Sequence, residues 1–106
     1  RVIDDDQVAV TNLQRQILFA TADVGRLKAE VAAERLAALN PRVEIDARAV
    51  RLSVDNADAL IGGVNLVLDG SDSFETRGVV SDACVRLGVP LIAGALGRWE
   101  GQIVLL

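Results

Sequence analysis

The chain has 106 residues, of which 51% are hydrophobic, with one cysteine and a net charge of -4. This apolar content suffices for one packed domain without an internal disulfide, and no apolar run approaches the roughly twenty residues of a membrane span. The acidic balance, with no basic stripe carrying interleaved aromatics, argues against nucleic acid as the main partner. One cysteine cannot form an internal disulfide and no membrane-length run is present, so we expect a cytoplasmic protein without a membrane partner.

The first element is a short apolar run, Val2 and Ile3, that leads into Asp4, Asp5 and Asp6. This pattern is typical of a buried strand that ends at an acidic edge. In open α/β sheets ligands bind beyond the carboxyl ends of strands, where an aspartate can accept hydrogen bonds from ribose hydroxyls. Asp4 is the first candidate for that role and Asp6 the second, with a simple charged turn as the alternative.

The next segment, residues 11–16, reads T-N-L-Q-R-Q and is too polar for a core element. Its amides offer donors and acceptors, and Arg15 offers a planar cationic fork suited to phosphate oxygens. We interpret the segment as part of a nucleotide phosphate site. The alternative is a solvated connecting loop.

Residues 24–39 are predicted to form an amphipathic helix, capped by Asp23 and ended by the Asn40-Pro41 pair. Lys28 falls inside the apolar arc and in the first turn, where the helix dipole disfavours a cation. These two unfavourable features predict that its ammonium meets a bound phosphate. The alternative is that Lys28 covers apolar surface with its stem, and for Arg35, one heptad later, we keep that interpretation.

Two elements without an expected chemical role come next. Residues 43–50 alternate between apolar and polar side chains, as a half-exposed strand near a sheet edge does. Residues 53–61 are predicted to form a short helix, capped by Ser53 and stopped by Gly62 and Gly63.

Residues 64–68 are nearly all apolar, which is typical of a central parallel strand covered on both faces. The strand leads into the acidic turn D-G-S-D-S at residues 69–73, followed by a helix over residues 74–87. Carboxylates beside a polyphosphate are ligands for magnesium, and Asp72 is the better candidate because Asp69 can simply cap the turn. The alternative is an ordinary turn.

The last elements are a short buried strand at residues 91–95 and an apolar alternation that runs to Leu106, while Cys84 fits a small core residue of the preceding helix. The order of elements predicts an α/β fold with a mainly parallel sheet and flanking helices. Because both ends of the chain run through apolar, ordered-looking sequence, we expect a piece of a larger domain.

Five motifs occur in order across the chain: V-I-D-D-D, T-N-L-Q-R-Q, D-V-G-R-L-K-A-E, L-V-L-D-G-S-D-S-F-E-T-R and R-W-E-G-Q-I. This series resembles the ThiF/MoeB/HesA-type adenylyltransferase family, whose adenylating domain is shared with ubiquitin-activating enzymes. The molybdopterin-synthase adenylyltransferases look closest, and the thiamine-pathway adenylyltransferases are hard to separate from them. The resemblance implies that residues 1–106 are a partial ThiF-type, Rossmann-like adenylating domain that lacks the first strand and its glycine-rich loop.

The resemblance also implies an activity. The family uses ATP and magnesium to adenylate the C-terminal glycine of a ubiquitin-like sulfur-carrier protein, in molybdopterin biosynthesis for the closest group. It further implies a homodimer, and zinc held by cysteine pairs that would lie beyond Leu106.

The family's site residues carry over onto matching positions of this chain. Asp4 resembles the ribose-binding aspartate, Lys28 the phosphate-binding lysine, and Asp72 the aspartate tied to magnesium and activation. Arg15 is similar to an arginine that can reach the nucleotide of the other subunit. The segment that lines the ATP phosphates corresponds to Thr11, Asn12, Leu13, Gln14 and Arg15. Ser73, beside Asp72, and Ser81 stand where close relatives often carry asparagine.

Two other classes of function stay open at the level of sequence. One is a non-catalytic scaffold of adenylating type, which Ser73 and Ser81 make conceivable. The other is a dinucleotide-binding oxidoreductase domain that uses Asp4 on a ribose. The polar segment and the acidic turn have no obvious task in hydride transfer, which favours adenylation.

Overall fold

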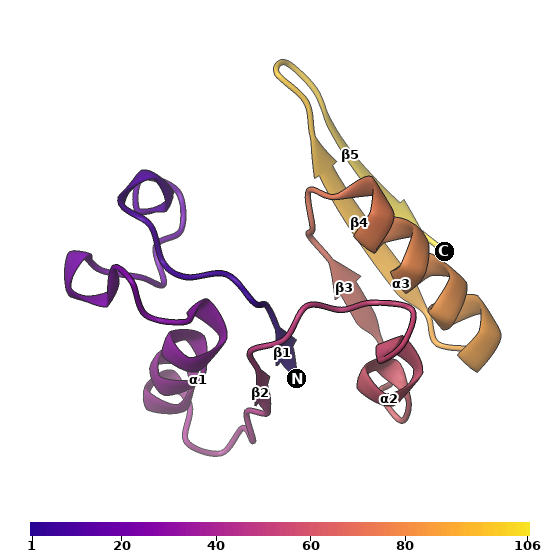
Figure 1. Cartoon of the computed structure of the whole chain (residues 1–106), viewed down its shortest axis with the longest axis horizontal. Coiled ribbons are helices and arrows are strands. Elements are labelled where there is room, and N and C mark those ends of the chain that lie inside the picture. The colour runs from indigo at the N-terminus through magenta and orange to yellow at the C-terminus, as the bar shows by residue number, and fades with distance from the viewer. The chain divides into compact units, whose positions relative to one another are not determined.

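Helices and short strands alternate along the chain in the computed structural model, which describes residues 1–106. The residues divide into two compact units, Arg1–Arg51 and Leu52–Leu106, each with its own strands and helices (Figure 1). The α/β fold expected from the order of elements is confirmed, with two parallel strand pairs and one antiparallel pair. None of the helices has the length and apolar character needed to cross a bilayer.

The first unit is built from two paired strands and one long helix. Its elements are β1 (Val2–Ile3), the 3-10 turns η1 (Val10–Asn12) and η2 (Thr21–Asp23), α1 (Lys28–Leu39) and β2 (Ala47–Arg48). The two strands run parallel, with Val2 opposite Ala47. α1 contacts both strands and buries Ala29, Val31 and Ala32. The helix therefore supports the strand that ends at the acidic residues.

The second unit is a three-stranded sheet with two helices. Its elements are α2 (Ala57–Ile61), β3 (Val67–Asp69), α3 (Phe74–Leu87), β4 (Leu91–Leu96) and β5 (Gly101–Leu105). β3 pairs parallel with β4, and β4 pairs antiparallel with β5, as the long hairpin in Figure 1 shows. Cys84 is a core residue, as predicted. The core of this unit consists of Ala57, Ile61, Val80, Ala83, Cys84 and Leu91.

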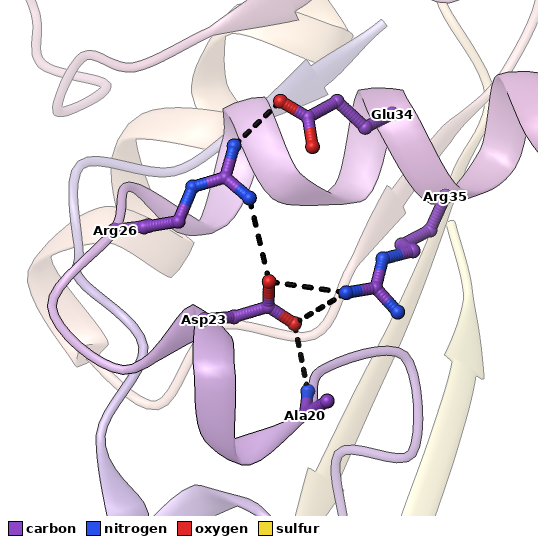
Figure 2. A network of polar contacts seen from close by, with 5 residues as sticks. All are labelled: Ala20, Asp23, Arg26, Glu34 and Arg35. Carbon is purple, nitrogen blue, oxygen red and sulfur yellow. Dashed lines mark hydrogen bonds and ion pairs between the residues drawn. The ribbon is translucent and has the colours of Figure 1, made fainter.

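The start of α1 differs from the prediction. The helix begins at Lys28 rather than Val24, because Gly25 adopts a left-handed φ of 88° that breaks a helix. Asp23 is not the cap of α1. It ends η2, and its carboxylate accepts the Ala20 amide and contacts Arg26 and Arg35 (Figure 2). The expectation that Arg35 only covers apolar surface is therefore wrong.

Three further boundaries and one burial expectation also differ. Only Ala47 and Arg48 of the expected strand at residues 43–50 pair with another strand. α2 starts later than expected and is preceded by Asn56, whose side chain accepts the Ser53 amide. The strand expected at residues 64–68 begins only at Val67, and Leu68, expected to be covered, is 73% exposed. α3 has the predicted bounds, and Asn40 ends α1 as predicted.

Candidate functional site

The acidic residues after β1 form a close group. The backbone amide of Asp4 donates to the Arg48 carbonyl at 3.2 Å, which extends the pairing of β1 with β2 by one residue. The Asp4 Oδ1 then accepts the Asp6 amide at 2.8 Å. One carboxylate oxygen from each of Asp4, Asp5 and Asp6 lies within 4.8 Å of the others. These oxygens can accept hydrogen bonds from hydroxyl groups or bind a hard cation.

Lys28 lies next to this acidic group. Its backbone amide donates to the Asp6 carbonyl at 2.9 Å, so the first residue of α1 is fastened to the end of β1. The Lys28 Nζ lies 3.8 Å from the Asp6 Oδ2, and its side chain is only 12% exposed. The structure thus brings Asp4, Asp6 and Lys28 together at one end of the first unit.

The polar segment at residues 11–16 lies between β1 and α1 in the chain and is folded on itself. The Asn12 Oδ1 accepts the Ala9 amide at 3.2 Å and so closes η1. The Arg15 Nη1 donates to the Thr11 carbonyl at 3.3 Å, while Gln14 and Arg15 stay exposed and Leu13 is half-buried. The Gln16 Oε1 is buried without a hydrogen-bond partner. Most of the hydrogen-bonding groups of Gln14 and Arg15 therefore remain open to an anion.

The second unit carries the other predicted residues at the end of β3. Asp69 is buried and its Oδ1 accepts the Ser71 amide at 2.8 Å, so it caps the turn as expected. Asp72 is exposed beyond this turn. Ser73 precedes α3, and its Oγ accepts the Thr76 amide at 3.3 Å. The exposed Asp72 carboxylate is an oxygen donor of the kind that hard cations prefer.

Hydrogen bonds from Arg77, which the sequence did not predict, hold this turn in place. The Arg77 guanidinium donates to the Ser71 carbonyl at 3.0 and 2.7 Å and also to the Gly94 carbonyl of β4. Arg77 therefore fastens the turn that carries Asp72 to the neighbouring strand. The signal in the sequence was an arginine four residues after Ser73, within the first turn of the predicted helix.

Cys84 of α3 is not prepared for nucleophilic chemistry. Burial raises the pKa of its thiol, and the negative charge of Asp69 raises it further. A nucleophilic cysteine needs the opposite shift, toward the thiolate. Cys84 thus has the structural role predicted for it.

The ThiF family profile matches residues 1–106, the whole of this chain. The chain belongs to the ThiF family. The family predicted from the ordered motifs is thereby confirmed.

Several relatives of this ThiF-family chain are named as adenylyltransferases. The sulfur carrier protein adenylyltransferase of Thermus thermophilus is 49% identical over 102 residues, which are 96% of this chain and 38% of the relative. The sulfur carrier protein ThiS adenylyltransferase of Escherichia coli is 40% identical over 97% of this chain and 41% of the relative. A probable molybdopterin-synthase adenylyltransferase of Pyropia yezoensis is 40% identical over 95% of this chain and 27% of the relative.

A solved structure shares the fold. The crystal structure of Escherichia coli MccB with AMPCPP and selenomethionine MccA superposes with a TM-score of 0.87 at 27% identity, over 98% of this chain and 32% of MccB. The ThiF-family chain thus spans well under half the length of each of these relatives.

Proposed function

We propose that this ThiF-family chain is the part of an ATP-dependent adenylyltransferase that binds the phosphates and ribose of ATP. The substrate is the C-terminal carboxylate of a ubiquitin-like sulfur-carrier protein, in molybdopterin biosynthesis. The thiamine pathway is the alternative, because one relative is named for molybdopterin synthase and another of similar identity for the sulfur carrier protein ThiS.

One observation carries the proposal. Lys28 has a nearly buried side chain, stands in the first turn of α1 and lies beside the acidic end of β1, 3.8 Å from the Asp6 carboxylate. A lysine at the positive end of a helix is unfavourable unless an anion offsets it, and the Asp6 carboxylate, 73% exposed and screened by solvent, does so only weakly. The family name, the named activity of the relatives and the nucleotide AMPCPP in the MccB structure support ATP as that anion.

The proposed step is a displacement at the α-phosphorus of ATP. A carboxylate oxygen of the carrier forms a bond to this phosphorus, the bond to the oxygen that bridges the α- and β-phosphates breaks, and pyrophosphate leaves. Both reactants are anions, so cationic side chains lower the repulsion and stabilise the charge that builds on pyrophosphate. Arg15 and Lys28 are the residues proposed for this role. No general base is needed, since the carboxylate is already ionised near neutral pH.

Each remaining residue has a proposed task in binding. Asp4 accepts hydrogen bonds from the ribose, while the phosphates lie along Thr11, Asn12, Leu13, Gln14 and Arg15. Asp72 is proposed as the magnesium ligand and Ser73 as its neighbour in the site, because an exposed carboxylate at a strand end supplies the oxygen donor that magnesium prefers. Magnesium supplies charge neutralisation on the phosphates when bound. We also propose a homodimer, in which Arg15 reaches the nucleotide of the partner subunit.

Exchange of radiolabelled pyrophosphate into ATP tests the proposal in the full-length protein. We expect exchange that depends on a carrier ending in Gly-Gly, and the comparison of a molybdopterin-type with a ThiS-type carrier assigns the pathway. Asp72→Ala should abolish exchange while the thermal unfolding curve stays unchanged. Asp82→Ala, which removes an exposed carboxylate from the outside of α3, is the matched control and should keep full exchange.

Two outcomes contradict the proposal in different ways. Binding of ATP or carrier without any exchange would identify a non-catalytic scaffold. Retained exchange in Asp72→Ala would remove this aspartate from the mechanism while leaving adenylation itself intact.

A further inference from the structure

The loop at residues 9–24 is closed at its base by backbone hydrogen bonds. The Val8 amide donates to the Arg26 carbonyl at 2.8 Å, and the Gly25 amide donates back to the Val8 carbonyl at 2.9 Å. The Lys28 amide donates to the Asp6 carbonyl at 2.9 Å just outside this pair. The loop therefore carries the polar segment at residues 11–16, and its exit leads directly into Lys28.

The loop has little packing of its own. From residue 9 to residue 28, Asp23 is the one residue that is buried, with 2% of its surface exposed. Val10 and Ile17 are 66% and 94% exposed, and Leu13, Leu18 and Phe19 are only half-buried. Asp23 therefore supplies the loop's one fully buried side chain, in addition to the backbone hydrogen bonds at the loop's base.

The Asp23 carboxylate is the centre of a network of polar contacts (Figure 2). The Asp23 Oδ2 accepts the Ala20 amide at 2.8 Å, and the Arg35 Nη2 donates to both Asp23 oxygens, at 2.8 and 3.1 Å. The Arg26 Nη1 reaches Asp23 at 3.4 Å, while its Nη2 donates to Glu34 at 2.5 Å. The Ala20 amide, followed by the charges of Arg35 and Arg26, outweighs burial and lowers the pKa of Asp23, so the group is ionised.

Arg35 makes the network a link between two parts of the site. It lies on α1, seven residues after Lys28, which is about two turns of the same helix. Asp23 belongs to the loop that carries Arg15. The ion pair thus fastens the loop to the helix whose first residue is Lys28, at a second point remote from the backbone pairing at the loop's base.

The Asp23–Arg35 pair is a weak device for stability alone, because Asp23 is buried with 3% of its side chain exposed while Arg35 keeps 43% exposure. Burying the carboxylate costs desolvation free energy, and solvent screens its attraction to the half-exposed guanidinium. What the pair does provide is geometry, because the two Asp23 oxygens accept from the Ala20 amide, Arg26 and Arg35 at once, and charge-assisted hydrogen bonds add geometric specificity.

We propose that Asp23 and Arg35 are positioning residues of the nucleotide site, which hold the loop with Arg15 and the start of α1 with Lys28 in one arrangement around the phosphates of ATP. This inference rests on the proposed function. Neither side chain touches the nucleotide. Without the pair the loop samples several arrangements, and the apparent affinity for ATP falls by the fraction of molecules that hold the competent one.

Asp23→Asn and Arg35→Met test the inference in the full-length protein. Asparagine keeps an oxygen for the Ala20 amide but loses the charge, and methionine keeps most of the arginine stem. Arg35→Lys is the conservative variant, because it keeps the charge and one donor. The matched control is Asp58→Asn, which removes a carboxylate from an aspartate–arginine pair with Arg86 that is exposed on the second unit.

The measurements are KM for ATP, KM for the carrier and kcat of pyrophosphate exchange, at a temperature at which circular dichroism shows every variant fully folded. If the competent arrangement falls to a tenth of the population, KM for ATP rises about tenfold. We expect that rise in Asp23→Asn and Arg35→Met, with kcat and the KM for the carrier nearly unchanged. Arg35→Lys should recover part of the loss, and Asp58→Asn should match the wild type.

The outcomes separate this inference from the proposed function. Suppose that the wild type exchanges pyrophosphate and that folded Asp23→Asn or Arg35→Met has an unchanged KM for ATP. This outcome overturns the positioning role alone. Equal rises in both KM values would also overturn it, because they indicate general loosening. A wild type that neither exchanges pyrophosphate nor binds ATP overturns the proposed function, and the positioning role with it. Should Asp23→Asn fail to fold, the two Arg35 variants decide.

Discussion

Replacing Lys28 by methionine should separate stability from activity. The Lys28 side chain is 12% exposed. Methionine keeps its apolar stem and removes only the ammonium. If Lys28 serves a bound phosphate, the folded protein without ligand loses little, while the complex with ATP loses a charged contact. If Lys28 only covers apolar surface, neither quantity changes much.

The magnitude follows from two opposing effects in the first unit. The ammonium stands at the positive end of α1, which costs about 0.3–1 kcal/mol, and its removal relieves this cost. The pair with Asp6, whose side chain is 73% exposed, is separated by 3.8 Å and is screened by solvent. Such a pair contributes about 0–1 kcal/mol, so the two effects nearly cancel. We therefore expect the free energy of unfolding of Lys28→Met to stay within about 1 kcal/mol of the wild type.

The loss in activity should be much larger. A hydrogen bond to a charged group contributes about 1.5–3 kcal/mol, which corresponds to about 10- to 150-fold in binding or rate. Urea unfolding measures the first quantity and pyrophosphate exchange the second. Arg42→Met, which removes an exposed cation from the same unit, is the control and should change neither. Exchange in Lys28→Met within about twofold of the wild type would refute the phosphate role, since the loss worked out above is at least about tenfold.

Two further predictions concern stability. Ser73→Ala removes the oxygen that accepts the Thr76 amide and should cost about 1 kcal/mol in urea unfolding, while Ser73→Asn should restore the cap; equal stability of the two variants would contradict the capping role. Hydrogen bonds from Arg48 and Arg1 lower the pKa of Asp46 from 3.8 to about 2. Since the folded pKa is the lower one, this contribution to stability is complete above pH 3.8 and is lost as the pH falls toward about 2. Asp46→Asn should flatten the pH dependence of thermal unfolding in that window, and an unchanged slope would contradict the assignment.

Helix ends were predicted correctly where neighbouring residues alone determine them. α3 has the predicted bounds because Ser73 caps its start and Gly88, with a φ of 68°, ends it. The Asn40-Pro41 pair ended α1 for the same kind of reason, since the residue before a proline avoids helical geometry.

Prediction failed where distant contacts decide. Asp23 is a good cap by residue type, but its carboxylate is committed to Arg35, twelve residues away, and to its own turn. Leu68 belongs to a continuous apolar run, which is typical of a strand covered on both faces, yet it is 73% exposed. Such a run does not identify the layers that would cover the strand. For the candidate site, the types of Asp4 and Lys28 were visible in the sequence. Only the fold shows that both contact Asp6, Asp4 through the Asp6 amide and Lys28 through the Asp6 carboxylate.

The two cations proposed for the phosphates differ in how far the fold constrains them. The Lys28 backbone is fastened to Asp6, and its side chain is nearly buried in the first turn of a helix. Arg15 lies in an irregular segment, exposed, with one side-chain hydrogen bond, to the Thr11 carbonyl at 3.3 Å. A constrained cation costs little entropy when it binds, whereas a mobile one must be ordered and can reach farther. Lys28 is therefore the residue that fixes where the phosphates lie, and Arg15 is suited to close on them afterwards, in its own subunit or in the partner of the proposed dimer.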